Sequence, residues 1–86
     1  MDPKGKAVLI TGGARIGRAV AVALAERGAD VAMTYRKSKK SAEEAVTRVR
    51  DLGVRGLAVR ADLTSEADLG NAIKKVSRAF GGMDIL

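Results

Sequence analysis

One short stretch near the start of the chain has the residue types that hold a phosphate: Thr-Gly-Gly-Ala-Arg-Ile-Gly, at residues 11–17. The apolar residues 7–11 predict a β-strand, and the residues after Gly17 predict a helix. A strand, a glycine turn and a helix expose backbone N–H groups and the positive end of a helix dipole. Glycine is needed because a side chain would hold a pyrophosphate away from the backbone. The stretch therefore predicts a nucleotide-binding loop.

The residues around this loop separate three classes of nucleotide-binding protein. Gly12 and Gly17 have the spacing of a P-loop, but that motif continues with Lys and Ser or Thr, whereas Arg18 and Ala19 follow here. A receiver-type phosphoacceptor fold requires acidic residues at the end of the first strand, where this chain has Thr11 and Gly12. Dinucleotide binding is the class that remains.

A basic stretch, Tyr-Arg-Lys-Ser at residues 35–38, follows the second predicted strand. NAD-binding versions of such folds place a carboxylate here for the ribose 2′-hydroxyl, whereas a 2′-phosphate favours arginine. This stretch has no carboxylate, and Arg36 can form paired bonds with phosphate or stack on adenine. Arg15 can approach from the glycine loop, while Lys39 and Lys40 are interpreted as solvated. The sequence therefore predicts NADP(H) as the cofactor in preference to NAD(H).

These residues require elements that bring them together. Strands are expected at residues 7–11, 30–35, 56–61 and 83–86. The first helix is expected to bury Ile16, Val20, Ala23 and Leu24. Capping boxes are expected at Ser41 with Glu44 and at Ser65 with Asp68, ahead of the second and third helices. The resulting order is βαβαβαβ.

This order predicts an α/β, Rossmann-like fold in a single, partial dinucleotide-binding domain at residues 1–86. Right-handed crossovers predict a truncated parallel sheet of order 3-2-1-4, with the glycine loop at the switch point between strands one and four. Helices one and two should cover one face and helix three the other. We expect a single helix to cover the second face poorly. Self-association through that face, or through the open sheet edge, is therefore predicted.

The composition limits other functions. The 86 residues include no cysteine and no histidine, so disulfides, thiolate metal sites and a histidine base are all excluded. No apolar run approaches the ~20 residues that span a bilayer, and a cytoplasmic location is expected, without a membrane partner. The net charge of +6 suggests nucleic acid, but one Tyr and one Phe leave little for base stacking. Nucleic-acid binding is therefore the least favoured class.

Residues 11–19 resemble the cofactor loop of the short-chain dehydrogenase/reductase family, whose pattern is Thr-Gly-x-x-x-Gly-x-Gly. Asp62-Leu63 resembles that family's Asp followed by an apolar residue at the adenine, although Asp62 can also cap the third helix. Residues 80–86 resemble the approach to its Asn-Asn-Ala-Gly strand. Within the family, the chain is most similar to 3-oxoacyl-carrier-protein reductases and pteridine reductases.

The resemblance implies the NADP(H)-binding N-terminal portion of an oxidoreductase. The family reaction is hydride transfer between nicotinamide and a carbonyl or hydroxyl carbon. The predicted cofactor-binding residues are Gly12, Gly13, Arg15, Ile16, Gly17, Tyr35, Arg36, Lys37, Ser38, Asp62 and Leu63.

Two departures from the family pattern qualify this interpretation. The loop is one residue short among residues 14–16, so the first helix must begin early or rotate. The family's catalytic Ser and Tyr-x-x-x-Lys would lie beyond Leu86, so the chain alone is expected to be inactive. Tyr35 and Lys39 match Tyr-x-x-x-Lys only by coincidence, because they lie at the expected adenosine end. The alternative is a non-catalytic fragment or interaction module with weak or no nucleotide binding.

Overall fold

The computed structural model describes residues 4–11, 14–37, 39–62 and 64–84, without the side chains of residues 14–16. Strands and helices alternate along the chain, as the sequence predicts. The elements are β1 (Ala7–Ile10), α1 (Ala14–Glu26), β2 (Asp30–Tyr35), α2 (Lys39–Asp51), β3 (Gly56–Arg60) and α3 (Glu66–Phe80). No helix in these ranges combines the length and apolar character needed to cross a membrane.

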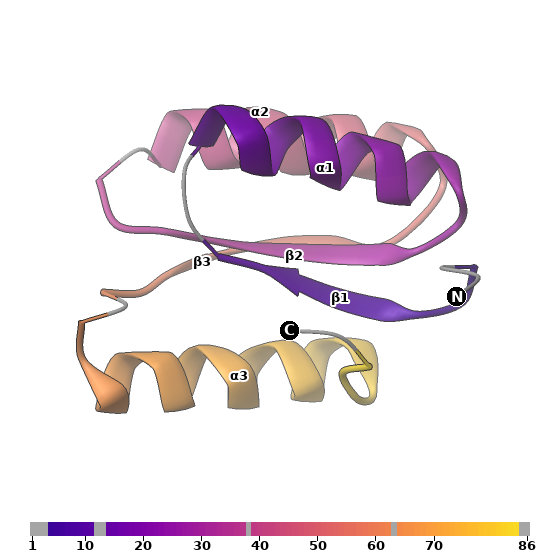
Figure 1. Ribbon diagram of the computed structural model, residues 1–86. Helices are drawn as coiled ribbons and strands as arrows, with labels where there is room; N and C mark the ends of the chain where they lie inside the picture. Colours follow the sequence, from indigo (N-terminus) through magenta and orange to yellow (C-terminus); the bar gives the residue numbers. More distant parts are fainter. Residues whose placement is uncertain (1–3, 12–13, 38, 63, 85–86) are drawn as a thin grey trace.

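The three strands form a parallel sheet in the order β1-β2-β3. Ala7 pairs with Asp30 at one side of β2, and Val31 pairs with Gly56 at the other. Helices α1 and α2 lie on one face of the sheet and α3 lies on the opposite face (Figure 1). The predicted Rossmann-like α/β fold and the distribution of helices over the two faces are therefore confirmed.

The predicted fourth strand is not seen in the part of it that the structure describes. Met83 and Asp84 have no strand conformation, and residues 85–86 lie outside the described ranges. Asp84 nevertheless lies beside β1, because its N–H donates to the carbonyl of Ala7 at 2.9 Å and its Oδ2 accepts from the N–H of Ala7 at 2.9 Å. The strand order 3-2-1-4 stays a prediction.

The sheet has an apolar core on each face. The core between the sheet and helices α1 and α2 contains the buried residues Val8, Ala21, Ala25, Ala29, Val31, Met33, Ala45 and Val49. Against α3, they are Ala7, Leu9, Ala32, Val59, Ala61, Ala72, Val76 and Phe80. The expectation that α3 would cover its face poorly is therefore wrong. Three of the five strand-side residues on that face are alanines, so one helix comes close enough to bury them.

Helix α1 differs from the prediction at its start and in its buried face. It begins at Ala14 rather than after Gly17, so Gly17 is a helical residue. Val20 is 43% exposed and Ala23 is exposed too. Leu24 is partly buried against the core, as predicted, and the rest of the face toward the sheet contains Gly17, Ala21 and Ala25. Small residues let the helix backbone approach the strands closely, which outweighs burial of the larger Val20.

The predicted caps of the other two helices have opposite outcomes. Helix α2 begins at Lys39, so Ser41 lies inside it and the predicted cap there is wrong. The i,i+4 ion pair of Lys39 with Glu43, 3.8 Å between Nζ and Oε1, supports this earlier first turn. The cap of α3 is confirmed, because the Ser65 side chain accepts from the N–H of Asp68 at 3.3 Å.

Candidate functional site

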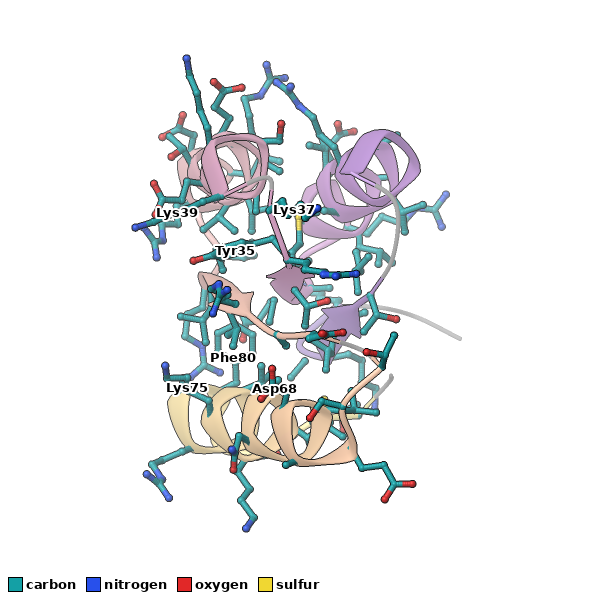
Figure 2. All side chains as sticks on the ribbon, turned by 90° about the vertical axis from the view of Figure 1, so that its left-hand side faces the viewer. Tyr35, Lys37, Lys39, Asp68, Lys75 and Phe80 are labelled. Carbon is teal, nitrogen blue, oxygen red and sulfur yellow. The ribbon has the colours of Figure 1, made fainter. Side chains whose placement is uncertain are left out.

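A hollow of about 350 Å³ lies where β2 and β3 end. Figure 2 looks onto this end of the sheet, with Tyr35 and Lys37 labelled near the end of β2. Three segments meet there: the residues after β2, the end of β3 and the first turn of α3. The hollow is lined by Arg36, Lys37, Arg60, Ala61, Asp62 and Asp68. The carboxyl ends of parallel strands are where open α/β sheets bind ligands.

The residues after β2 give the hollow its positive charge. The carbonyl of Tyr35 accepts from the N–H of Ala61 at 2.8 Å, which fixes the end of β2 beside the end of β3. Arg36 and Lys37 follow and are exposed. Neither cation forms an ion pair with a carboxylate in the described ranges, so both are available to an anionic ligand. Ser38 lies outside those ranges.

Asp62 supplies a charged acceptor in the same hollow. Its Oδ1 accepts from the hydroxyl of Thr64 at 2.7 Å and from the N–H of Thr64 at 3.0 Å. These bonds hold the pKa of Asp62 below its ordinary value of 3.8, against an opposing effect of burial, and Arg36 and Arg60 lower it further. An ionised carboxylate only accepts hydrogen bonds, which matches the amino group of an adenine. Leu63, its predicted companion, lies outside the described ranges.

Three residues of the hollow, Arg60, Ala61 and Asp68, were not among the predicted site residues, and two of them are charged. Asp68 was expected only as part of a cap, yet its Oδ2 also accepts from the N–H of Asp62 at 3.1 Å. It therefore fixes the backbone that carries Asp62. Arg60 is the last residue of β3 and adds a third cation. Its place at the carboxyl end of a predicted strand was a signal that could have identified it.

The glycine loop is only partly described. Gly12 and Gly13 lie outside the described ranges. Arg15 and Ile16 are part of α1, but their side chains are not described. Gly17 is buried, and a Cβ placed there would lie 3.4 Å from both the Ile10 and Met33 side chains. Gly17 therefore lies at the contact between α1 and the sheet, where the third glycine of a dinucleotide loop has its packing role.

This role of Gly17 indicates where the loop is short. If Gly17 is the packing glycine, the missing residue precedes it, at the position where the backbone approaches the pyrophosphate. Only three residues separate the end of β1 from Ala14, the first residue of α1. On that condition, the short loop bears on the expected pyrophosphate end rather than on the adenosine end.

The Tyr-x-x-x-Lys match at Tyr35 and Lys39 has no catalytic arrangement. Tyr35 ends β2 and Lys39 begins α2, so the two residues are not one turn apart on a helix. The Nζ atom of Lys39 instead pairs with Oε1 of Glu43 at 3.8 Å. This agrees with the interpretation of the match as a coincidence.

Comparison with known sequences places this geometry in a family. A family model described as short chain dehydrogenase matches residues 6–86. The hydroxynaphthalene reductase arp2 of Aspergillus fumigatus is 45% identical over 83 residues, which cover 95% of this chain and 30% of that relative. General stress protein 39 of Bacillus subtilis is 45% identical over 84 residues, which cover 96% of this chain and 29% of that relative. The chain thus spans less than a third of either relative.

Solved structures show the same fold with both cofactors. A short chain dehydrogenase from Burkholderia cenocepacia in complex with NADP has a TM-score of 0.92 and 44% identity, over 99% of this chain and 36% of that one. A blue fluorescent protein from a metagenomic library, in complex with NADPH, has a TM-score of 0.90 and 32% identity, over 99% and 36%. An NAD⁺-bound xylitol dehydrogenase has a TM-score of 0.87 and 33% identity, over 99% and 33%.

Proposed function

The chain belongs to the short-chain dehydrogenase family, and we propose that it forms the NADP(H)-binding part of an oxidoreductase of that family. In the complete protein, the bound cofactor exchanges a hydride with a carbonyl or hydroxyl carbon of the substrate. The described residues bind and orient the adenosine end. Assignment to the 3-oxoacyl-carrier-protein or pteridine reductases remains a prediction, since the two relatives above have other names.

The observation that carries the proposal is the charge distribution of the hollow at the ends of β2 and β3. Arg36 and Lys37 follow β2 in a stretch, residues 35–38, that contains no carboxylate of its own, so a ribose 2′-phosphate finds cations there. Asp62, ionised and fixed by Thr64, is positioned to accept from the adenine amino group. Arg15 is proposed to approach from the glycine loop, with the amides of residues 12–17 at the pyrophosphate.

Calorimetric titration with NADPH and NADH tests this assignment. A charge-assisted bond from Arg36 to phosphate contributes on the order of 1.5–3 kcal/mol, so NADPH should bind about tenfold or more tightly than NADH. Arg36→Asp should remove or reverse that preference. Lys40→Asp makes the same charge change on the exposed start of α2 and should leave the preference within about twofold. Equal affinity for the two cofactors in the unchanged chain contradicts the assignment.

The short glycine loop favours a second candidate function, an interaction module that binds nucleotide weakly or not at all. Inserting one glycine between Arg15 and Ile16 separates the two candidates. If the loop misplaces its amides, the insertion recovers about one hydrogen bond and should tighten NADPH binding by about threefold to tenfold. Binding that is absent both before and after the insertion supports the interaction module. Binding that is strong from the start and unchanged shows that the short loop has adapted.

Self-association of the chain is a separate proposal, now restricted to a strand edge. Both faces of the sheet are covered by helices in the described ranges (Figure 1). The residues of β1 that follow Ala7 have no charged side chain. A strand edge without charges favours pairing with a strand of another chain. Sedimentation velocity at increasing concentration should show association. A strict monomer throughout contradicts it. A cytoplasmic setting is proposed because the sequence contains no cysteine.

A further inference from the structure

Strand β3 lies at one edge of the sheet, and its outer side is open in the described ranges. The N–H of Val31 donates to the carbonyl of Arg55 just before β3, and the N–H of Ala61 donates to the carbonyl of Tyr35 just after it. In a parallel ladder, alternate residues direct both backbone groups toward the same neighbour. Odd-numbered residues of this segment therefore bond to β2, and the backbone groups at positions 56, 58 and 60 face away from it.

On the outer edge of β3, a side chain of α2 bonds to the backbone where the strand begins, whereas the backbone is open where the strand ends. Arg50 of α2 donates from Nε and Nη2 to the carbonyl of Gly56, at 3.1 and 2.9 Å. No described side chain bonds to the corresponding backbone groups of Ala58 and Arg60. Two N–H groups and two carbonyls are therefore available to a strand that approaches this edge.

A hollow flanks the open edge on each face of the sheet. The hollow on the α3 side has a volume of about 340 Å³ and is lined by Val59, Arg60, Asp68, Asn71, Ala72, Lys74, Lys75 and Arg78. The hollow on the α2 side has a volume of about 310 Å³ and is lined by Glu43, Val46, Thr47, Arg50, Leu57 and Ala58. Successive side chains of an added strand point to opposite faces, so they would enter the two hollows in turn.

The hollow on the α3 side is strongly positive. It combines four cations, Arg60, Lys74, Lys75 and Arg78, with the single carboxylate of Asp68. None of the four forms an ion pair with a carboxylate in the described ranges. Figure 2 shows Lys75 and Asp68 on α3, on the side of the sheet opposite α2. An acidic side chain that enters this hollow meets a net positive charge.

We propose that the outer edge of β3 binds an extended acidic segment of a partner protein, which adds a strand to the sheet. Main-chain bonds to Ala58 and Arg60 supply affinity, and every second side chain of the segment, when acidic, enters the hollow on the α3 side. The side chains between them, small and neutral or apolar, enter the hollow on the α2 side, beside Val46 and Ala58. Charge complementarity selects the partner and speeds its association.

Two other occupants fit the edge less well. A second copy of this chain would bring its own Arg60, Lys75 and Arg78 against the same residues, and like charges across an interface are unfavourable. Single-stranded nucleic acid needs aromatic platforms, but the only aromatic side chain of α3, Phe80, is buried in the core. Both occupants are tested as competitors below.

Fluorescence anisotropy with a labelled Glu-Thr-Glu-Thr-Glu-Thr peptide tests the proposal on the 86-residue chain. The peptide should bind, and a Lys-Thr peptide of the same length should bind at least tenfold more weakly. A Glu-Thr peptide with an N-methylated backbone has the same charge but cannot donate backbone hydrogen bonds to β3. Its affinity should therefore also be at least tenfold lower. Equal binding of the methylated peptide overturns strand addition, and so does the absence of any binding by the Glu-Thr peptide.

Charge reversal locates the peptide on the molecule. The double variant Lys75→Glu/Arg78→Glu should weaken peptide binding at least tenfold and leave NADPH affinity unchanged, since neither residue lines the hollow at the end of β2. Arg48→Glu, on an exposed part of α2 outside both edge hollows, should change peptide affinity by less than twofold. Equal losses in Arg48→Glu and the double variant overturn the proposal, and so does displacement of the peptide by a single-stranded oligonucleotide at lower concentration.

Hydrogen exchange gives a readout that needs no variant. Binding of the Glu-Thr peptide should slow exchange of the Ala58 and Arg60 amides at least tenfold, because the added strand occupies them. The amides that already bond to β2, such as that of Ala61, should change much less. Exchange at Ala58 and Arg60 that stays unaltered in the saturated complex overturns the proposal, because the peptide then lies elsewhere.

Discussion

At the scale of single residues, Asp62 shows how one side chain serves both fold and site. Its Oδ1 accepts two bonds from Thr64, and its backbone is bonded to Asp68 and Ser65 at the start of α3. The turn thus fixes the carboxylate before any ligand arrives. Preorganisation of this kind lowers the cost of binding, because the group need not be ordered by the ligand.

Removing the hydroxyl of Thr64 should change the acidity of Asp62. The largest cause of its lowered pKa is that hydroxyl, so Thr64→Val should raise the pKa toward its ordinary value of 3.8. Because folding lowers this pKa, the associated stabilisation is present above pH 3.8 and is lost as pH falls through the lower folded value. Carbon-13 NMR titration of the Asp carboxyls measures the shift. An identical Asp62 titration in both proteins would show that Thr64 is not its cause.

At the scale of elements, the sequence predicts the first three strands well and the faces of helices less well. The bounds of β2 agree with its predicted range, while β1 and β3 each end one residue earlier than expected. Apolar runs bounded by Gly and charged residues define such buried strands. Hydropathy alone misplaced the buried face of α1, because Gly17 and Ala21 contribute through closeness of approach rather than through apolar area.

The candidate site was predictable to a similar degree. Arg36, Lys37 and Asp62 could be predicted because strand ends of a parallel sheet meet at one edge. The bond from the N–H of Asp62 to Asp68 could not, because it depends on the exact turn between β3 and α3. A local sequence signal showed Asp68 as a cap partner but contained no information about a second bond across that turn.

Arg55 joins three elements, and its replacement should destabilise all of them together. Its side chain bonds to Asp30 at 2.8–2.9 Å and to the carbonyl of Phe80 at 3.1 Å, and it lies 5.3 Å from the centre of the Phe80 ring. Arg55→Lys keeps the charge but loses the planar fork. After allowance for solvent screening at this exposed side chain, we expect a loss of about 1–2 kcal/mol of unfolding free energy.

Urea denaturation measures the effect of Arg55→Lys. The control is Arg48→Lys, because Arg48 is also an exposed arginine and no hydrogen bond or ion pair ties it to another described residue. The control should change the unfolding free energy by less than about 0.5 kcal/mol. Equal stability of the two variants would mean that the contacts of Arg55 join the elements without net stabilisation.

At the scale of the whole molecule, the positive charge gathers in two regions that share Arg60. One is the hollow at the ends of β2 and β3, which we assign to the dinucleotide. The other is the outer edge of β3 with α3, which we assign to an acidic segment. Together the two regions contain Arg36, Lys37, Arg60, Lys74, Lys75 and Arg78, out of the 16 basic residues of the chain. The two assignments predict separate responses to NADPH and to acidic peptide.

An NMR titration of the nitrogen-15-labelled chain with NADPH tests the dinucleotide site most directly. We predict that the largest amide shifts fall at residues 14–17, 36–37 and 61–62 and saturate with a single dissociation constant. NADH should move residues 36–37 much less, because it has no 2′-phosphate. Largest shifts at residues 74–78, or shifts that never saturate and do not distinguish NADPH from NADH, would contradict binding at the ends of the strands.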